Sequence, residues 1–144
     1  RSVIMQMTVA ENLKLAAVPT DVAVGHFPAL EKTLGRKAGL CSGGEQQMLS
    51  LARALGRNPK VLLADELSLG LAPIIVSHLL DAVRAAADRD GVGVLLVEQH
   101  VRQALRIADR VYLMERGRVV LDGTTDEVAG QLDRIEDAYL AAGG

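Results

Sequence analysis

Residues 61–66 read Val-Leu-Leu-Ala-Asp-Glu, four apolar side chains followed directly by two carboxylates. A continuous apolar run without alternation predicts a buried strand that is covered on both faces. Asp65 and Glu66 then lie at the carboxyl end of that strand, which is the edge where α/β folds bind ligands. The stretch therefore predicts an α/β fold with two acidic groups at a ligand-binding edge.

The residues that follow extend the α/β pattern. Residues 73–87 have helical spacing, with Ile74, Val76, Leu79, Leu80 and Val83 expected to face inward. Further elements are predicted in this order: a second buried strand at 92–97, a helix at 101–108, strands at 110–115 and 118–122 joined by a hairpin turn at Arg116-Gly117, a capped helix from Thr124, and a last helix at 133–142. Strands that alternate with helices indicate some parallel pairing.

The first part of the chain is predicted to be helical. A capping box of Thr8 and Glu11 opens a helix that Pro19 ends, and a short helix is expected over 28–34. Ser42, with Glu45 three residues later, caps a longer helix that closes at 56–59. We therefore divide the chain into a helical subdomain at 1–58, an α/β core at 59–123 and a helical tail at 124–144.

Composition excludes several classes of function. The chain has 144 residues, is 49% hydrophobic and carries a net charge of -2, so it can form a core but has no field that would attract nucleic acid. Its only aromatic residues are Phe27, Tyr112 and Tyr139, too few to stack on bases. The single cysteine, Cys41, excludes an internal disulfide. No apolar run reaches the roughly 18 residues of a membrane span, and the start does not have the pattern of a signal peptide.

Ser42, Gly43 and Gly44 form a second candidate site. Glycines at the amino end of a helix allow backbone N–H groups to approach an anion, and the helix dipole favours negative charge there. The simpler alternative is an ordinary capping box with Glu45. Likewise, Asp65 and Glu66 taken alone fit a turn cap and a solvated surface charge.

The order and spacing of these two stretches favour the functional interpretation. Residues 42–48 followed by 61–66 resemble the signature motif and the Walker B strand of ABC-transporter ATPases. Residues 7–13 are similar to the stretch that follows the glutamine loop in that family. Stretches that fit the branched-chain amino-acid importer branch are 68–73, 97–99, 104–105, 107–110, 117–120 and 138–140. The resemblance thus implies the carboxy-terminal part of a P-loop NTPase domain, with a helical subdomain, a parallel-sheet core and a terminal β-hairpin.

The resemblance assigns roles at the strand end. Asp65 would hold Mg²⁺ through water and Glu66 would be the general base for ATP hydrolysis. The residue that polarises the γ-phosphate is Gln99 by its spacing to Ala108-Asp109-Arg110, with His100 directly after it as the alternative.

Other roles extend across a dimer. Ser42, Gly43, Gly44, Glu45 and Gln46 would contact the γ-phosphate of ATP held by a partner subunit. The D-loop would consist of the stretch from Ser68 through Leu69 and Gly70 to Leu71.

Three positions depart from the family pattern, and one of them is Gln99, which stands where most members have histidine. Cys41 replaces the usual leucine before Ser-Gly-Gly, and we interpret it as a small buried hydrophobe rather than a reactive thiol. Leu67 replaces the usual proline after the catalytic glutamate, which frees the backbone and is expected to loosen the D-loop.

The function that the resemblance implies is an ATPase subunit of an importer, with branched-chain amino acids as the expected substrate class. It would dimerise with an identical or different ATPase subunit, bind transmembrane permease subunits, and sit peripherally on the cytoplasmic face of the inner membrane. The 144 residues contain no Gly-x-x-x-x-Gly-Lys phosphate loop, so alone they are expected to show negligible activity. The alternatives are a non-transport ABC-type ATPase of DNA repair or translation, and a non-catalytic interaction module.

Overall fold

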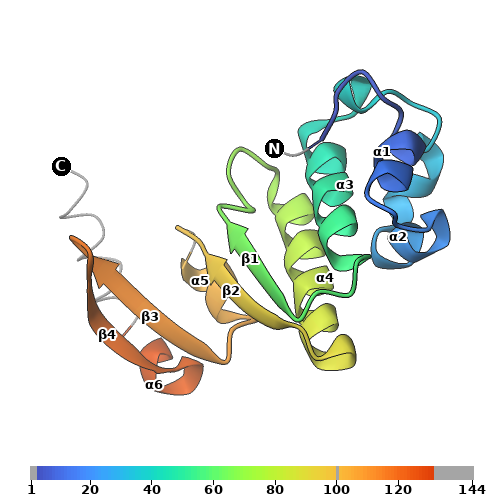
Figure 1. Ribbon diagram of the computed structural model, residues 1–144. Helices are drawn as coiled ribbons and strands as arrows, with labels where there is room; N and C mark the ends of the chain where they lie inside the picture. Colours follow the sequence, from blue (N-terminus) through green and yellow to red (C-terminus); the bar gives the residue numbers. More distant parts are fainter. Residues whose placement is uncertain (1–2, 100, 132–144) are drawn as a thin grey trace. The chain divides into compact units, whose positions relative to one another are not determined.

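The computed structural model describes residues 3–99 and 101–131, and they fall into two compact units (Figure 1). The first unit runs to Glu98 and the second starts at Gln99. The expected division into 1–58, 59–123 and 124–144 therefore stays a prediction.

The first unit begins with short helices around one longer helix. They are α1 (Val9–Leu15), α2 (Thr20–His26), the 3₁₀ helices η1 (Pro28–Thr33) and η2 (Ala38–Leu40), and α3 (Gly43–Leu55). The capping boxes at Thr8 and Ser42 are both present, as predicted. Helix α2 was missed because Pro19 was interpreted only as a stop. Proline also precedes helices readily, and here it is the residue before the first turn of α2.

The rest of the first unit is a strand-helix-strand unit. Strand β1 (Val61–Asp65) pairs in parallel with β2 (Gly93–Val97), and α4 (Pro73–Asp90) connects them. Gly91 ends α4 in the left-handed region, at a φ of 66°. The parallel pairing confirms the predicted α/β core.

Within the first unit the described residues pack on one face of the sheet, so cover on both faces stays a prediction. Leu62 and Ala64 are buried, whereas Val61 and Leu63 point the other way and are 62% and 73% exposed. A continuous apolar run cannot reveal which face is packed, because side chains alternate between the two faces of a strand. One face of β1 and β2 is therefore a bare apolar surface.

Helix α3 packs against α1 and α2 on one side and against α4 on the other. The largest fully buried side chains of this core include Leu13, Leu30, Leu49 and Leu79. Ile74 is 62% exposed, contrary to prediction. It lies two residues before Val76, about 200° around the helix from the buried stripe, because each residue turns the helix by about 100°.

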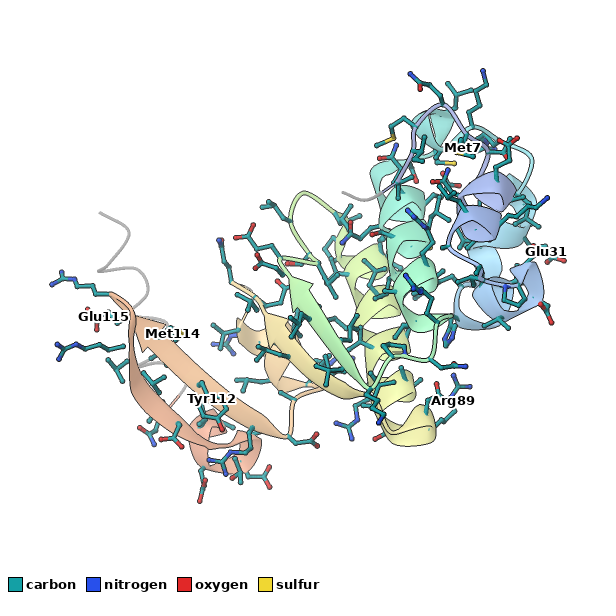
Figure 2. All side chains as sticks on the ribbon, in the orientation of Figure 1. Met7, Glu31, Arg89, Tyr112, Met114 and Glu115 are labelled. Atoms are coloured by element: carbon teal, nitrogen blue, oxygen red, sulfur yellow. The ribbon has the colours of Figure 1, made fainter. Side chains whose placement is uncertain are left out.

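The second unit consists of α5 (Val101–Leu105), β3 (Arg110–Glu115), β4 (Arg118–Thr124) and α6 (Thr125–Ala129). Strands β3 and β4 form the predicted antiparallel hairpin. Arg116 and Gly117 both have positive φ, 46° and 78°, as a tight hairpin turn requires. Tyr112 and Met114 project from β3 and are 56% and 62% exposed (Figure 2).

The end of this unit is fixed by a third capping box, in which Glu127 accepts from the backbone N–H of Thr124 at 2.8 Å. The helix predicted at 133–142 lies outside the described residues. Of the helices in residues 3–99 and 101–131, none is at once sufficiently long and sufficiently apolar to traverse a membrane.

Candidate functional site

Asp65 and Glu66 are placed by the end of β1, as the sequence predicted. Asp65 is the last residue of the strand and is exposed, and Glu66 is half-buried. The backbone N–H of Glu66 donates to the carbonyl oxygen of Val97 at 2.9 Å. The parallel ladder therefore continues one residue beyond β1 and fixes the backbone of Glu66.

Glu66 has a φ of 49°, in the left-handed region that non-glycine residues seldom adopt. A residue that precedes proline is restricted to extended conformations. Leu67, which stands where the family has proline, is therefore compatible with the backbone turn at Glu66.

Leu67 does not leave the segment loose. Its side chain is only 6% exposed, so apolar burial holds the segment at the point where proline would have stiffened it. The expected loosening of the D-loop is thus offset by packing. The following residues turn tightly: Leu69 N–H donates to the Glu66 carbonyl at 3.3 Å and Leu71 N–H to the Ser68 carbonyl at 3.1 Å. Gly70 takes a φ of 73° in this turn.

Ser68 is bound to Glu98 on the neighbouring strand end. One carboxylate oxygen of Glu98 accepts from the Ser68 backbone N–H at 2.9 Å, and the other accepts a short hydrogen bond from the Ser68 hydroxyl. Ser68 is 4% exposed. Glu98 lies within the stretch 97–99 that fits the importer branch, but no role was predicted for it. The available signal was its position directly after the second parallel strand, since such ends meet at one edge.

Ser42 and Glu45 form a closed local pair at the start of α3. The Ser42 Oγ accepts from the Glu45 N–H at 3.2 Å, and the Glu45 carboxylate accepts from the Ser42 N–H at 2.7 Å. Glu45 also lies 3.6 Å from the guanidinium of Arg36. The Ser42 hydroxyl thus uses an acceptor position in the cap and keeps its proton to donate.

The two glycines of this stretch have different surroundings. A Cβ at Gly43 would lie 3.5 Å from Leu71 Cδ2, whereas one at Gly44 would lie 2.8 Å from Ile75 Cγ2. Gly44 is therefore required for close packing of α3 against α4. The start of α3 therefore lies next to the first turn of α4 within one chain. In an α-helix the N–H groups of the first turn have no intrahelical partner, so Gly43 supplies an exposed donor.

Gln46 and Cys41 have structural roles in this region. The Gln46 side-chain amide donates to the carbonyls of Ala38 at 3.0 Å and Cys41 at 3.1 Å, fixing the loop before the helix. Cys41 is 8% exposed, and burial raises the pKa of its thiol. This agrees with the interpretation of Cys41 as a small buried hydrophobe.

Gln99 is exposed and starts the second unit, where its carbonyl accepts from the Val101 N–H at 3.0 Å. Glu66 belongs to the first unit, so the proximity of Gln99 to Glu66 stays a prediction. His100 lies outside the described residues. Within the described ranges, His, Cys, Asp and Glu side chains form no group of three or more that could hold a metal ion.

Comparison with known proteins shows which proteins the chain is similar to. Residues 2–68 match the family model described as ABC transporter. The chain is 42% identical, over 97% of its length, to the high-affinity branched-chain amino acid transport ATP-binding protein BraG of Pseudomonas aeruginosa. The chain is thus similar to an ABC-transporter ATP-binding protein along nearly its whole length. It is also 40% identical, over 88% of its length, to the probable branched-chain amino acid transport ATP-binding protein LivF of Archaeoglobus fulgidus.

Solved structures of ABC cassettes share the fold. The ADP conformation of MJ1267, an ATP-binding cassette of an ABC transporter, superposes with a TM-score of 0.78 at 25% identity, covering 94% of this chain and 63% of that one. The dimeric MJ0796 cassette bound to ADP and Pi gives a TM-score of 0.73 at 23% identity, covering 86% and 59%. The chain spans only part of these relatives, with the aligned region covering 63% of the length of BraG and 58% of LivF.

Proposed function

We propose that this chain supplies the signature helix and the catalytic strand end of an ATPase subunit that drives import of branched-chain amino acids. The observation that carries the proposal is the end of β1, where Asp65 and Glu66 follow a parallel strand and the Glu66 backbone is held by Val97. Two carboxylates at such an edge suit phosphoryl transfer, which needs a group for the metal and a group that orients the attacking water. The names of the relatives BraG and LivF support the substrate class.

The proposed roles are those that the family resemblance implies. Glu66 acts as general base on water, and Asp65 holds Mg²⁺ through a water ligand. Mg²⁺ prefers oxygen ligands and is commonly bound by one or two carboxylates together with substrate phosphates, so a single exposed Asp65 fits. The metal would neutralise charge on the phosphates. Gln99, with His100 as the alternative, would polarise the γ-phosphate.

The start of α3 acts on a second nucleotide. The Ser42 hydroxyl and the exposed amide of Gly43 would donate to the γ-phosphate of ATP bound by a partner ATPase subunit, where the helix dipole adds favourable charge. Glu45 and Gln46 hold this helix end in shape through their bonds to Ser42, Ala38 and Cys41. Closure of the dimer around ATP would then be transmitted to permease subunits at the cytoplasmic face of the inner membrane.

ATP hydrolysis by the product of the complete reading frame tests this proposal. We expect magnesium-dependent phosphate release that Glu66→Gln reduces by at least about a hundredfold, because the amide cannot accept the proton of water. Glu31→Gln, a matched change at an exposed residue of η1 (Figure 2), should leave the rate unchanged. Residues 1–144 alone should release no phosphate above background. Glu66-independent hydrolysis would contradict the assignment.

Partner binding separates transport from the other classes. The product of the complete reading frame is mixed with detergent-solubilised branched-chain permease subunits, with duplex DNA or with ribosomes. Binding to the permease alone supports the proposed function. Binding to DNA or ribosomes would instead support a repair or translation ATPase.

A further inference from the structure

We propose that Glu98 is a positioning residue that holds the catalytic Glu66 in place through Ser68, an inference that rests on the proposed ATPase function. Glu98 follows β2 directly and Glu66 follows β1 directly. The register pairs Asp65 with Val97, so Glu66 and Glu98 emerge at the same edge of the sheet. The two residues thus meet by topology although 31 residues separate them in sequence.

The contact is bidentate. Both carboxylate oxygens of Glu98 are used on one residue, accepting from the backbone N–H and from the hydroxyl of Ser68. Two charge-assisted hydrogen bonds from one planar group fix orientation as well as distance. Because Ser68 is 4% exposed, water cannot readily replace the carboxylate if it is lost.

The contact acts on a short and constrained segment. Only Leu67 separates Ser68 from Glu66, and its side chain is buried. Glu66 is held on its other side by the hydrogen bond from its N–H to Val97. Its left-handed φ of 49° is therefore retained between a backbone bond before it and the Ser68–Glu98 contact after it. Loss of the Glu98 carboxylate leaves the hydrogen bond to Val97 and the longer one, 3.3 Å, from the Leu69 N–H to the Glu66 carbonyl.

Glu98 also precedes Gln99, the candidate for the γ-phosphate switch. The carboxylate that binds the D-loop serine is thus attached covalently to the residue before the switch. A displacement of the D-loop is thereby passed to the start of that segment. This arrangement gives Glu98 a role beyond holding two strands together.

Three variants of the complete reading frame test the inference. Glu98→Gln keeps the size of the side chain, but its amide oxygen can serve as only one of the two acceptors, and its amide nitrogen can only donate. Ser68→Ala removes the hydroxyl and keeps the backbone N–H contact. The third variant combines both changes, and Glu31→Gln is the control.

A positioning role predicts a split between kinetic parameters. We expect Glu98→Gln to lower kcat for ATP hydrolysis by roughly tenfold to a hundredfold with KM for ATP changed by less than about twofold, because a base displaced by about 1 Å loses activity on this scale. Ser68→Ala should lower kcat by roughly threefold to tenfold. The double variant should resemble Glu98→Gln alone, since both changes break one contact.

The following outcomes would contradict the positioning role of Glu98. Glu98→Gln with an unchanged kcat, or independent multiplicative losses in the double variant, would overturn the inference while leaving the ATPase assignment intact. If Glu98→Gln fails to fold, Ser68→Ala decides by the same split between kcat and KM. Hydrolysis that does not depend on Glu66 would overturn both proposals at once.

Discussion

The start of α3 and the end of β1 hold their candidate functional residues in two different ways. Ser42 and Glu45 are three residues apart and satisfy each other within one helical turn. Ser68 and Glu98 are 30 residues apart and meet only after β1 and β2 have paired. A local site can form with its helix, whereas the strand end is assembled only by the tertiary fold. The two regions should therefore respond differently to substitution.

The largest effect is expected where burial holds the strand end. Leu67→Ala removes a side chain that is 6% exposed and should lower the free energy of unfolding by roughly 2–4 kcal/mol. Leu69→Ala is the matched control, because Leu69 is two residues away and 61% exposed; it should cost less than about 0.5 kcal/mol. Urea denaturation followed by circular dichroism measures both. Equal losses would show that the segment is not held by the side chain of Leu67.

The contact between the start of α3 and helix α4 is tested at Gly44. Gly44→Ala places a methyl group 2.8 Å from Ile75 Cγ2, and overpacking of this kind should cost roughly 1–3 kcal/mol of unfolding free energy. Gly35→Ala is the control, since nothing lies within 4 Å of a Cβ there. Adding Ile75→Ala to Gly44→Ala should restore part of the loss. The absence of any recovery would mean that strain arises elsewhere.

A smaller effect is expected when the local cap is removed. Ser42→Ala abolishes the acceptor for the Glu45 N–H and should cost about 1 kcal/mol. Ser50→Ala, within the same helix, should be neutral or slightly stabilising. Amide hydrogen exchange should accelerate at the start of α3 and remain unchanged at Ser68. Faster exchange at Ser68 would argue that the two regions are coupled.

The smallest effect is expected on the pH dependence of stability, through the capping box of Thr8 and Glu11. The Glu11 carboxylate accepts from the Thr8 N–H at 2.7 Å, and this backbone hydrogen bond lowers the pKa of Glu11 below 4.5. Its stabilising contribution is complete above the unfolded-state pKa and is lost as the pH falls through the folded-state pKa. Stability measured from pH 6 to pH 3 should thus fall slightly less steeply in Glu11→Gln than in the wild type.

Capping boxes and the hairpin turn were predictable from the sequence. Contacts between residues that are distant in the sequence were not. The capping boxes at Thr8 and Ser42 and the turn at Arg116-Gly117 depend on neighbouring residues only, and all three are present. Helix α2 was missed because one proline can both end and precede a helix. The Ser68–Glu98 contact was missed because it depends on strand register.

The strand end shows the same limit in finer detail. Its position after an apolar run identified Asp65 and Glu66, but the left-handed backbone of Glu66 follows from tertiary bonds to β2. The burial of Leu67 likewise could not be predicted, because a single apolar residue in a loop can be either buried or exposed. Residue type thus indicated the chemistry of the site, and the fold determined its geometry.

The bare face of β1 and β2 has a practical consequence for any preparation of this chain. Leu63 and Leu95 are direct partners across the two strands, and both project from this face with Val61 and Val97. Their exposed fractions range from 53% to 73%. In any state that leaves this face uncovered, molecules will adhere to one another through it as their concentration or the salt concentration rises. Colloidal stability, rather than the strength of the core, will then set the highest concentration at which the chain can be handled.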